Sequence, residues 1–116
     1  MNLLSDILIS ETTTIPNELG NIIKIIQAGQ EQKNQVSEVY CSWLRSNRTK
    51  AWKKQEIQTM NLFVIIGTIR FVFIDCNEKV MKIDINAGSK LLTIPPGIWS
   101  VSYTHLRAHE TLMNLV

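Results

Sequence analysis

The sequence predicts an all-β fold, either a sandwich or a barrel. Short runs rich in β-branched residues recur at intervals of about eight to twelve residues, turn residues separate them, and no stretch shows capped helical periodicity. The chain has 116 residues, which is room for one domain with one modest core. Hydrophobic residues make up 45% and charged residues 19%, an ordinary globular composition that argues against disorder.

The first third of the chain predicts two strands and an N-terminal lead-in. Residues 3–9 are apolar and fit an edge strand or a short lead-in, and residues 15–21 contain Pro16, Asn17 and Gly20, which favour a turn. The β-branched run 22–26 favours a strand, and residues 28–35 form a polar loop. Residues 36–44 alternate with the period of a strand.

The rest of the chain predicts strands separated by tight turns. A polar connection at 45–50 precedes a short candidate strand at 51–55. The following strands are expected at 60–66, 68–74, 80–85 and 90–94. Turns are expected at Gly67, at 75–79, at 86–89 and at the Pro-Pro-Gly of residues 95–97.

Charge and cysteine content narrow the partners and the compartment. The net charge of +2 is too small to indicate nucleic acid or an anionic membrane, and we expect neither as a partner. The longest apolar run, Leu62 to Ile66, is too short to span a bilayer. The start of the chain lacks the basic region of a signal peptide, and two isolated cysteines suit reduced thiols. These features predict a cytoplasmic protein.

Four segments in order resemble a cupin jelly roll, and more narrowly the dTDP-4-dehydrorhamnose 3,5-epimerase family. They are Glu38–Ser42, Lys50–Lys53, the Asn-Leu strand that runs into Gly67, and Ile94–Gly97. The resemblance covers roughly residues 15–99. It implies a cupin-type double-stranded β-helix and a homodimer. It also implies a nucleotide-sugar 3,5-epimerase or isomerase that acts on a dTDP-4-keto-6-deoxy sugar for surface polysaccharide synthesis.

The same resemblance allows the metal and catalytic positions to be compared one by one. Where metal-binding cupins have a His-x-His pair, this chain has Lys53 and Gln55, and Met60 takes the carboxylate position. A protonated lysine is a poor metal ligand and a thioether is too soft for a hard metal, so we expect no metal and no other cofactor.

Members of the epimerase family share an Arg-Gly-Leu-His segment. By the resemblance, Lys50 takes its arginine position and Lys53 the position of its catalytic histidine. Met60 falls near the family's lysine, and Leu19 near an arginine. The resemblance then makes Lys53 the base and Lys50 the cation that holds the diphosphate or the enolate. Two alternatives stay open: the lysines bind a diphosphate without turnover, or they form a solvent-facing basic edge that discourages strand pairing.

Six further residues are candidates for substrate binding, and each has an ordinary structural alternative. The candidates are Glu38, Tyr40, Trp52, Asn61, Asp75 and Trp99. The tryptophans can serve core or dimer packing, and the strand with Glu38 and Tyr40 can be solvated or part of the core. Asn61 can bond backbone inside the protein, and Asp75 can form a turn or a surface ion pair.

Residues 101–111, "VSYTHLRAHET", resemble a translated sequencing adapter. We therefore expect a cupin domain at 1–99 that is truncated, and a non-native tail at 100–116 that docks weakly or forms a helix. The jelly roll is then incomplete, and His105 and His109 are not taken as a metal pair. Besides the epimerase hypothesis, the chain can be a non-catalytic sugar-nucleotide-binding or structural cupin, or an inactive fragment.

Overall fold

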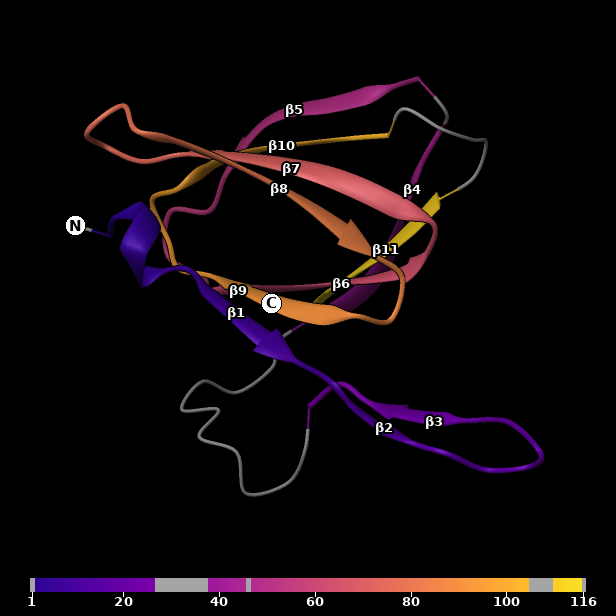
Figure 1. Ribbon diagram of the computed structural model, residues 1–116. Helices are drawn as coiled ribbons and strands as arrows, with labels where there is room; N and C mark the ends of the chain where they lie inside the picture. Colours follow the sequence, from indigo (N-terminus) through magenta and orange to yellow (C-terminus); the bar gives the residue numbers. More distant parts are fainter. Residues whose placement is uncertain (1, 27–37, 46, 105–109, 116) are drawn as a thin grey trace.

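Two antiparallel sheets face each other in the computed structural model, which describes residues 2–26, 38–45, 47–104 and 110–115 (Figure 1). The five-stranded sheet has the order β1 (Leu8–Glu11), β9 (Lys90–Ile94), β6 (Met60–Ile66), β11 (Glu110–Leu115) and β4 (Val39–Leu44). The four-stranded sheet has the order β5 (Thr49–Lys54), β10 (Trp99–Tyr103), β7 (Thr68–Ile74) and β8 (Val80–Asn86).

The chain passes repeatedly from one sheet to the other. It crosses between β4 and β5, between β6 and β7, and again at each connection from β8 to β11. This alternation is the jelly-roll arrangement and confirms the predicted all-β, cupin-type fold. The strands expected at 60–66, 68–74 and 90–94 are found with those bounds. Residues 28–35, expected as a loop, lie outside the described residues.

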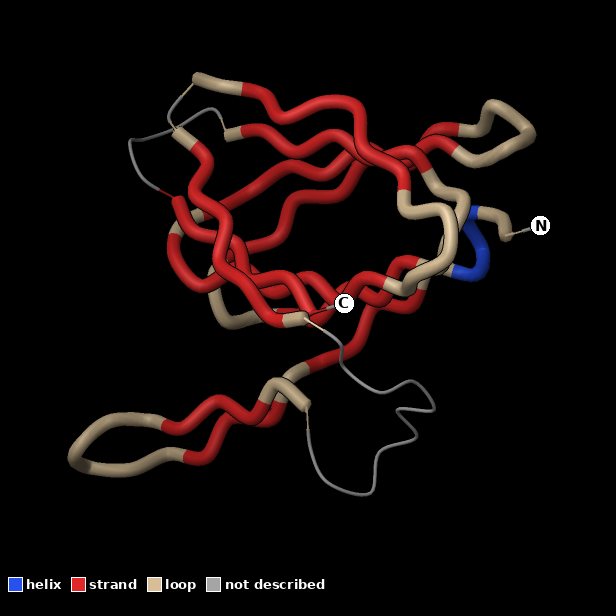
Figure 2. The backbone as a smooth tube through the Cα atoms, turned by 180° about the vertical axis from the view of Figure 1, so that it is seen from behind, coloured by secondary structure: helices blue, strands red, loops and turns tan. Residues whose placement is uncertain are grey.

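The N-terminal segment runs along the edge of the five-stranded sheet and then leaves it. A 3₁₀ turn at Leu4–Asp6 precedes β1, so residues 3–9 hold both a lead-in and the start of an edge strand. Strands β2 (Thr13–Ile15) and β3 (Ile22–Lys24) form a separate ribbon that projects from the sheets (Figures 1 and 2). Its turn is built as predicted, with the amide of Leu19 donating to Asn17 Oδ1 at 2.9 Å.

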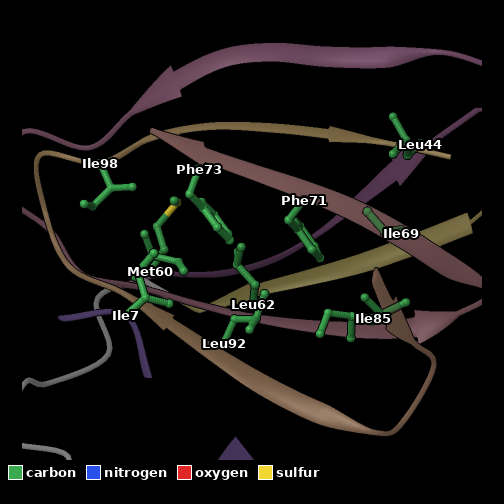
Figure 3. Packing of buried hydrophobic residues seen from close by; sticks show 12 residues of the cluster. Ile7, Leu44, Met60, Leu62, Ile69, Phe71, Phe73, Ile85, Leu92 and Ile98 are labelled. Atoms are coloured by element: carbon green, nitrogen blue, oxygen red, sulfur yellow. The ribbon is translucent and has the colours of Figure 1, made fainter. Parts of the chain in front are cut away.

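The core fills the space between the two sheets (Figure 3). Strand β7 alternates buried and half-buried residues, so every second side chain points at the opposite sheet. The rings of Phe71 and Phe73 stack there with centroids 5.9 Å apart. The buried apolar cluster also contains Ile7, Leu44, Met60, Leu62, Val64, Ile69, Ile85, Leu92, Ile94 and Ile98.

Two glycines allow the chain to change sheets. Gly67 joins β6 to β7 with a φ of 80°, and Gly97 follows the two prolines with a φ of 88°. A side chain is strained in this left-handed region, which explains glycine at both positions. The amide of Gly97 donates to the carbonyl of Gln55 at 2.8 Å and so ties the β9–β10 turn to the end of β5.

In the described part of the expected tail, residues 100–104 and 110–115, the structure shows strands paired with their neighbours where we expected weak docking or a helix. Ser100–Tyr103 continue β10, which pairs with both β5 and β7, and β11 pairs with both β4 and β6. Both are therefore interior strands, and a strand between two neighbours satisfies its backbone donors and acceptors on both sides. The non-native origin of the tail stays a prediction. His105 and His109 lie outside the described residues.

Candidate functional site

A cavity of about 200 Å³ lies between the two sheets, beside strands β4, β5 and β10. Its floor is apolar and consists of the buried side chains of Met60, Leu62 and Phe71. Its other lining residues are Ser42, Lys50, Ala51, Lys53, Ser100 and Ser102. The cavity therefore has an apolar bottom and a wall that carries two ammonium groups and three hydroxyls.

The two lysines reach across the cavity to strand β4. Lys50 Nζ donates to Ser42 Oγ at 2.6 Å, and Lys53 Nζ donates to the phenol oxygen of Tyr40 at 2.9 Å. Lys53 Nζ also lies 5.5 Å from the centroid of the Tyr40 ring, within the range of a cation–π contact. Neither ammonium is paired with a carboxylate among the residues that the structure describes.

An irregularity in β5 brings both lysines to the cavity. They are three positions apart, and side chains three apart point to opposite faces of a regular strand. Here Lys53 pairs with Ser100 and Lys50 pairs with Ser102, so β5 advances three residues where β10 advances two. The extra residue is a β-bulge, which turns the two ammonium groups to the same side. This placement argues against the alternative of a solvent-facing basic edge, because both lysines face the cavity.

The described lining of the cavity contains hydrogen-bond donors and positive charge and no carboxylate. Such a wall favours an anion, because ammonium groups and hydroxyls form charge-assisted hydrogen bonds with phosphate oxygens. The apolar floor suits the carbon skeleton of a ligand. In the described part of the chain, no group of three or more His, Cys, Asp or Glu side chains is placed to hold a metal ion.

No protein-family model and no curated protein matches the chain. Among solved structures, it is similar to a dTDP sugar isomerase from Desulfovibrio desulfuricans G20, with a TM-score of 0.84 and 26% identity over 95% of this chain and 75% of that chain. The chain has the fold of the dTDP-sugar isomerases and epimerases. This finding confirms the resemblance that the sequence predicts.

Two more distant structures have the same fold. The TDP-quinovose 3,4-ketoisomerase WlaRB from Campylobacter jejuni has a TM-score of 0.83 and 17% identity, covering 97% of this chain and 85% of that chain. The dTDP-6-deoxy-D-glucose-3,5-epimerase RmlC from Legionella pneumophila has a TM-score of 0.81 and 14% identity, covering 98% and 68%.

The structure places six of the predicted site residues in three different surroundings. Lys50 and Lys53 line the cavity, and Tyr40 is at its edge through its bond to Lys53. Glu38 is exposed just before β4 and is not among the lining residues. Trp52 and Trp99 instead lie on the outer face of the four-stranded sheet. With Ile74 they line a separate apolar hollow of about 360 Å³.

Asn61 lies on the opposite face of β6 from the cavity. Its neighbours Met60 and Leu62 line the cavity, so the alternation of the strand turns Asn61 away from it. Asn61 is 8% exposed, and its Oδ1 accepts a hydrogen bond from Thr93 Oγ1 at 2.8 Å. A buried amide with a cross-strand partner explains this residue without a ligand.

Asp75 serves the fold instead of the cavity. It is 4% exposed, and its oxygens accept backbone N–H groups of Leu4 at 3.1 Å, Asn77 at 2.9 Å and Lys79 at 3.2 Å. These amides, that of Leu4 foremost, lower the pKa of the Asp75 carboxyl below its ordinary value. The carboxylate ties the N-terminal turn to the β7–β8 turn, which agrees with the turn-forming alternative.

Sequence reasoning missed the three serines of the cavity wall, Ser42, Ser100 and Ser102. The strand period gives a signal for Ser42, because it shares a face with Tyr40. No such signal exists for Ser100 and Ser102, because both fall in the expected tail at 100–116, which was set apart from the fold for the adapter likeness of residues 101–111.

Proposed function

We propose that this protein binds a dTDP-linked 4-keto-6-deoxy sugar in the cavity and isomerises or epimerises it, as a step in surface polysaccharide synthesis. One observation carries the proposal: two ammonium groups share the wall of a cavity whose described lining has no carboxylate. The likeness to the dTDP sugar isomerase at 26% identity supports the same substrate class. A diphosphate would replace the hydroxyl partners of the lysines with fully charged ones.

The chemistry assigned to the lysines is proton transfer beside the ketone. Lys53 first gives a proton to water, and its free amine then takes the proton from the carbon next to the carbonyl, while the electron pair of that C–H bond moves into the enolate. The Lys50 ammonium stabilises the negative oxygen. A proton then returns to carbon, and the product has the same atoms as the substrate. Both lysines line one cavity, which supports their action on one ligand.

The deciding experiment is solvent deuterium exchange. The protein is incubated with dTDP-4-keto-6-deoxyglucose in D₂O, and deuterium beside the ketone is followed by NMR. We expect exchange with the wild type, none with Lys53→Met, and wild-type exchange with Lys82→Met, which removes an exposed lysine of β8 that is not among the lining residues. dTDP binding without exchange indicates a non-catalytic binding protein. A chain with no cooperative unfolding indicates an inactive fragment.

We also propose a homodimer and a cytoplasmic location. Ile15, Ile22 and Leu19 are exposed on the projecting ribbon, by 38%, 52% and 99%, which supports burial against a second copy. Sedimentation equilibrium tests the dimer, and a monomer at all concentrations would contradict it.

Both cysteines are free, in keeping with a reducing compartment. Within the described residues, no helix has the length and apolar character needed to cross a membrane.

A further inference from the structure

The bulge in β5 has an outer face as well as an inner one. The extra residue places Ala51 and Trp52 together opposite Val101 of β10. Ala51 lines the cavity with the lysines, whereas Trp52 turns outward to the hollow on the other face of the sheet. The same irregularity therefore directs the cations inward and a large aromatic side chain outward.

The outward tryptophan shares an apolar hollow with side chains of two other strands of the sheet. Trp52, Trp99 and Ile74 line one apolar hollow, and Trp52 keeps only 51% of its surface exposed although it is on an outer sheet face. Two positions further along β5, Lys54 also faces outward, with Nζ 4.9 Å from the centroid of the Trp99 ring. Trp52 and Lys54, both turned outward, thus flank Lys53.

A bulge without such an anchor can move along its strand. A shift of the extra residue by one position past Lys50 or Lys53 would turn that lysine to the outer face, because a one-residue slip inverts the side-chain direction. A slip past Lys53 would also bring the Trp52 indole to the inner face, into a cavity of about 200 Å³. The apolar surface that Trp52 buries on the outer face, where it lines the hollow with Trp99 and Ile74, opposes that movement.

We propose that Trp52 is a positioning residue for the ammonium pair: its partial burial in the outer hollow that it lines with Trp99 and Ile74 fixes the bulge so that Lys50 and Lys53 face one cavity. The ligand readout of this inference rests on the proposed function, because it uses dTDP as the probe. The side chain of Trp52 itself does not touch the ligand.

The first test compares dTDP affinities by titration calorimetry. We expect Trp52→Ala to weaken binding about tenfold or more, since one charge-assisted contact is lost when a lysine turns away. Trp52→Phe keeps an aromatic ring in the hollow and is expected to bind like the wild type. Trp43→Ala is the matched control, because Trp43 is 55% exposed on β4 and lines neither cavity.

Deletion of Ala51 separates positioning from a general loss of stability. It leaves Lys50 and Lys53 two positions apart, in register with Ser100 and Ser102, which are also two apart. A regular strand then directs both lysines inward without a bulge. We expect the Ala51 deletion to restore dTDP affinity in the Trp52→Ala background. A variant that is merely unstable would not recover by losing another residue.

Two results would overturn the proposal: wild-type affinity in Trp52→Ala, or no recovery in a cooperatively folded Ala51-deleted, Trp52→Ala protein. If the wild type does not bind dTDP, the proposed function fails, and a crystal structure of Trp52→Ala decides the inference separately. Lysines that still contact Ser42 and Tyr40 there contradict it, and one lysine turned to the outer face supports it.

Discussion

The Asp75 corner and the lysine wall both carry charge, and the sequence offered both as substrate contacts, yet the structure gives them opposite surroundings. Asp75 is buried and accepts three backbone N–H groups, which belong to Leu4, Asn77 and Lys79. Lys50 and Lys53 are exposed and donate only to hydroxyls among the described residues. The first charge is already fully engaged, and the second pair is available.

This contrast gives a physical criterion that separates a charge that stabilises the fold from a charge that can bind a ligand. Backbone amides that point at a carboxylate satisfy it permanently, and removing the carboxylate leaves them buried without an acceptor. Hydroxyls bond an ammonium group without cancelling its charge, so an anion can still displace them. We therefore expect substitutions at Asp75 to change stability and those at the lysines to change binding.

The largest expected effect is the loss of stability in Asp75→Ala. Three N–H groups lose their acceptor at a site that is 4% exposed, and we expect Tm to fall by roughly 10 °C or more. Asp75→Asn keeps one acceptor oxygen, so we expect its Tm to lie between that of Asp75→Ala and that of the wild type. Thermal unfolding by circular dichroism measures both. A decrease of only a degree or two would show that the corner is not held by this carboxylate.

The next-largest expected effect is a loss of dTDP binding with little change in stability. Lys50→Met and Lys53→Met are each expected to weaken dTDP binding about tenfold or more, with Tm changed by less than about 3 °C. Both lysines are exposed, so the fold does not depend on them. Calorimetric titration with Lys82→Met as control measures the effect. Equal affinity in all three variants would remove the lysine wall from the binding site.

A smaller effect is expected in acid. Because the pKa of Asp75 is lower in the folded state, its contribution to stability is present above the ordinary pKa of 3.8 and is lost as the pH falls through the folded value. Tm should therefore decrease below about pH 4 more steeply in the wild type than in Asp75→Asn. Scans between neutral pH and about pH 2 test this. Parallel curves would contradict the assigned pKa.

The smallest effect is expected for an exposed ion pair. Arg70 contacts both carboxylate oxygens of Asp84, at 2.6 and 2.9 Å, on the outer face of β7 and β8. Asp84, and after it Tyr103, raise the pKa of Arg70 above its ordinary value. Solvent screens this pair, so Asp84→Asn should lower Tm by less than about 4 °C. A decrease as large as that of Asp75→Ala would remove the distinction between exposed and buried charge.

Most strands could be predicted because β-branched runs and alternation reflect local requirements. Met60–Ile66 and Thr68–Ile74 appear with the predicted bounds, and Gly67 separates them with the positive φ that glycine tolerates. Strand β2 was missed, since three residues give too short a pattern to recognise. The strands of the tail were not predicted, because its likeness to an adapter suggested weak docking, whereas unpaired edges of neighbouring strands accept an added strand.

The candidate site was predicted only in part, for a geometric reason. The resemblance indicated Lys50 and Lys53, but residue spacing alone places them on opposite faces. It also gave no means to separate Asp75, Asn61 or the two outward tryptophans from a ligand contact, since a side chain's partners come from distant parts of the chain.

The sequence by itself determined the all-β class, the order of most strands and the family likeness, because these depend on local backbone preferences and on motif order. Only the tertiary structure decided which charges face the cavity. That outcome depends on the pairing of β5 with β10, where one extra residue reverses the direction of a side chain. A register between strands some fifty residues apart is not encoded in either strand alone.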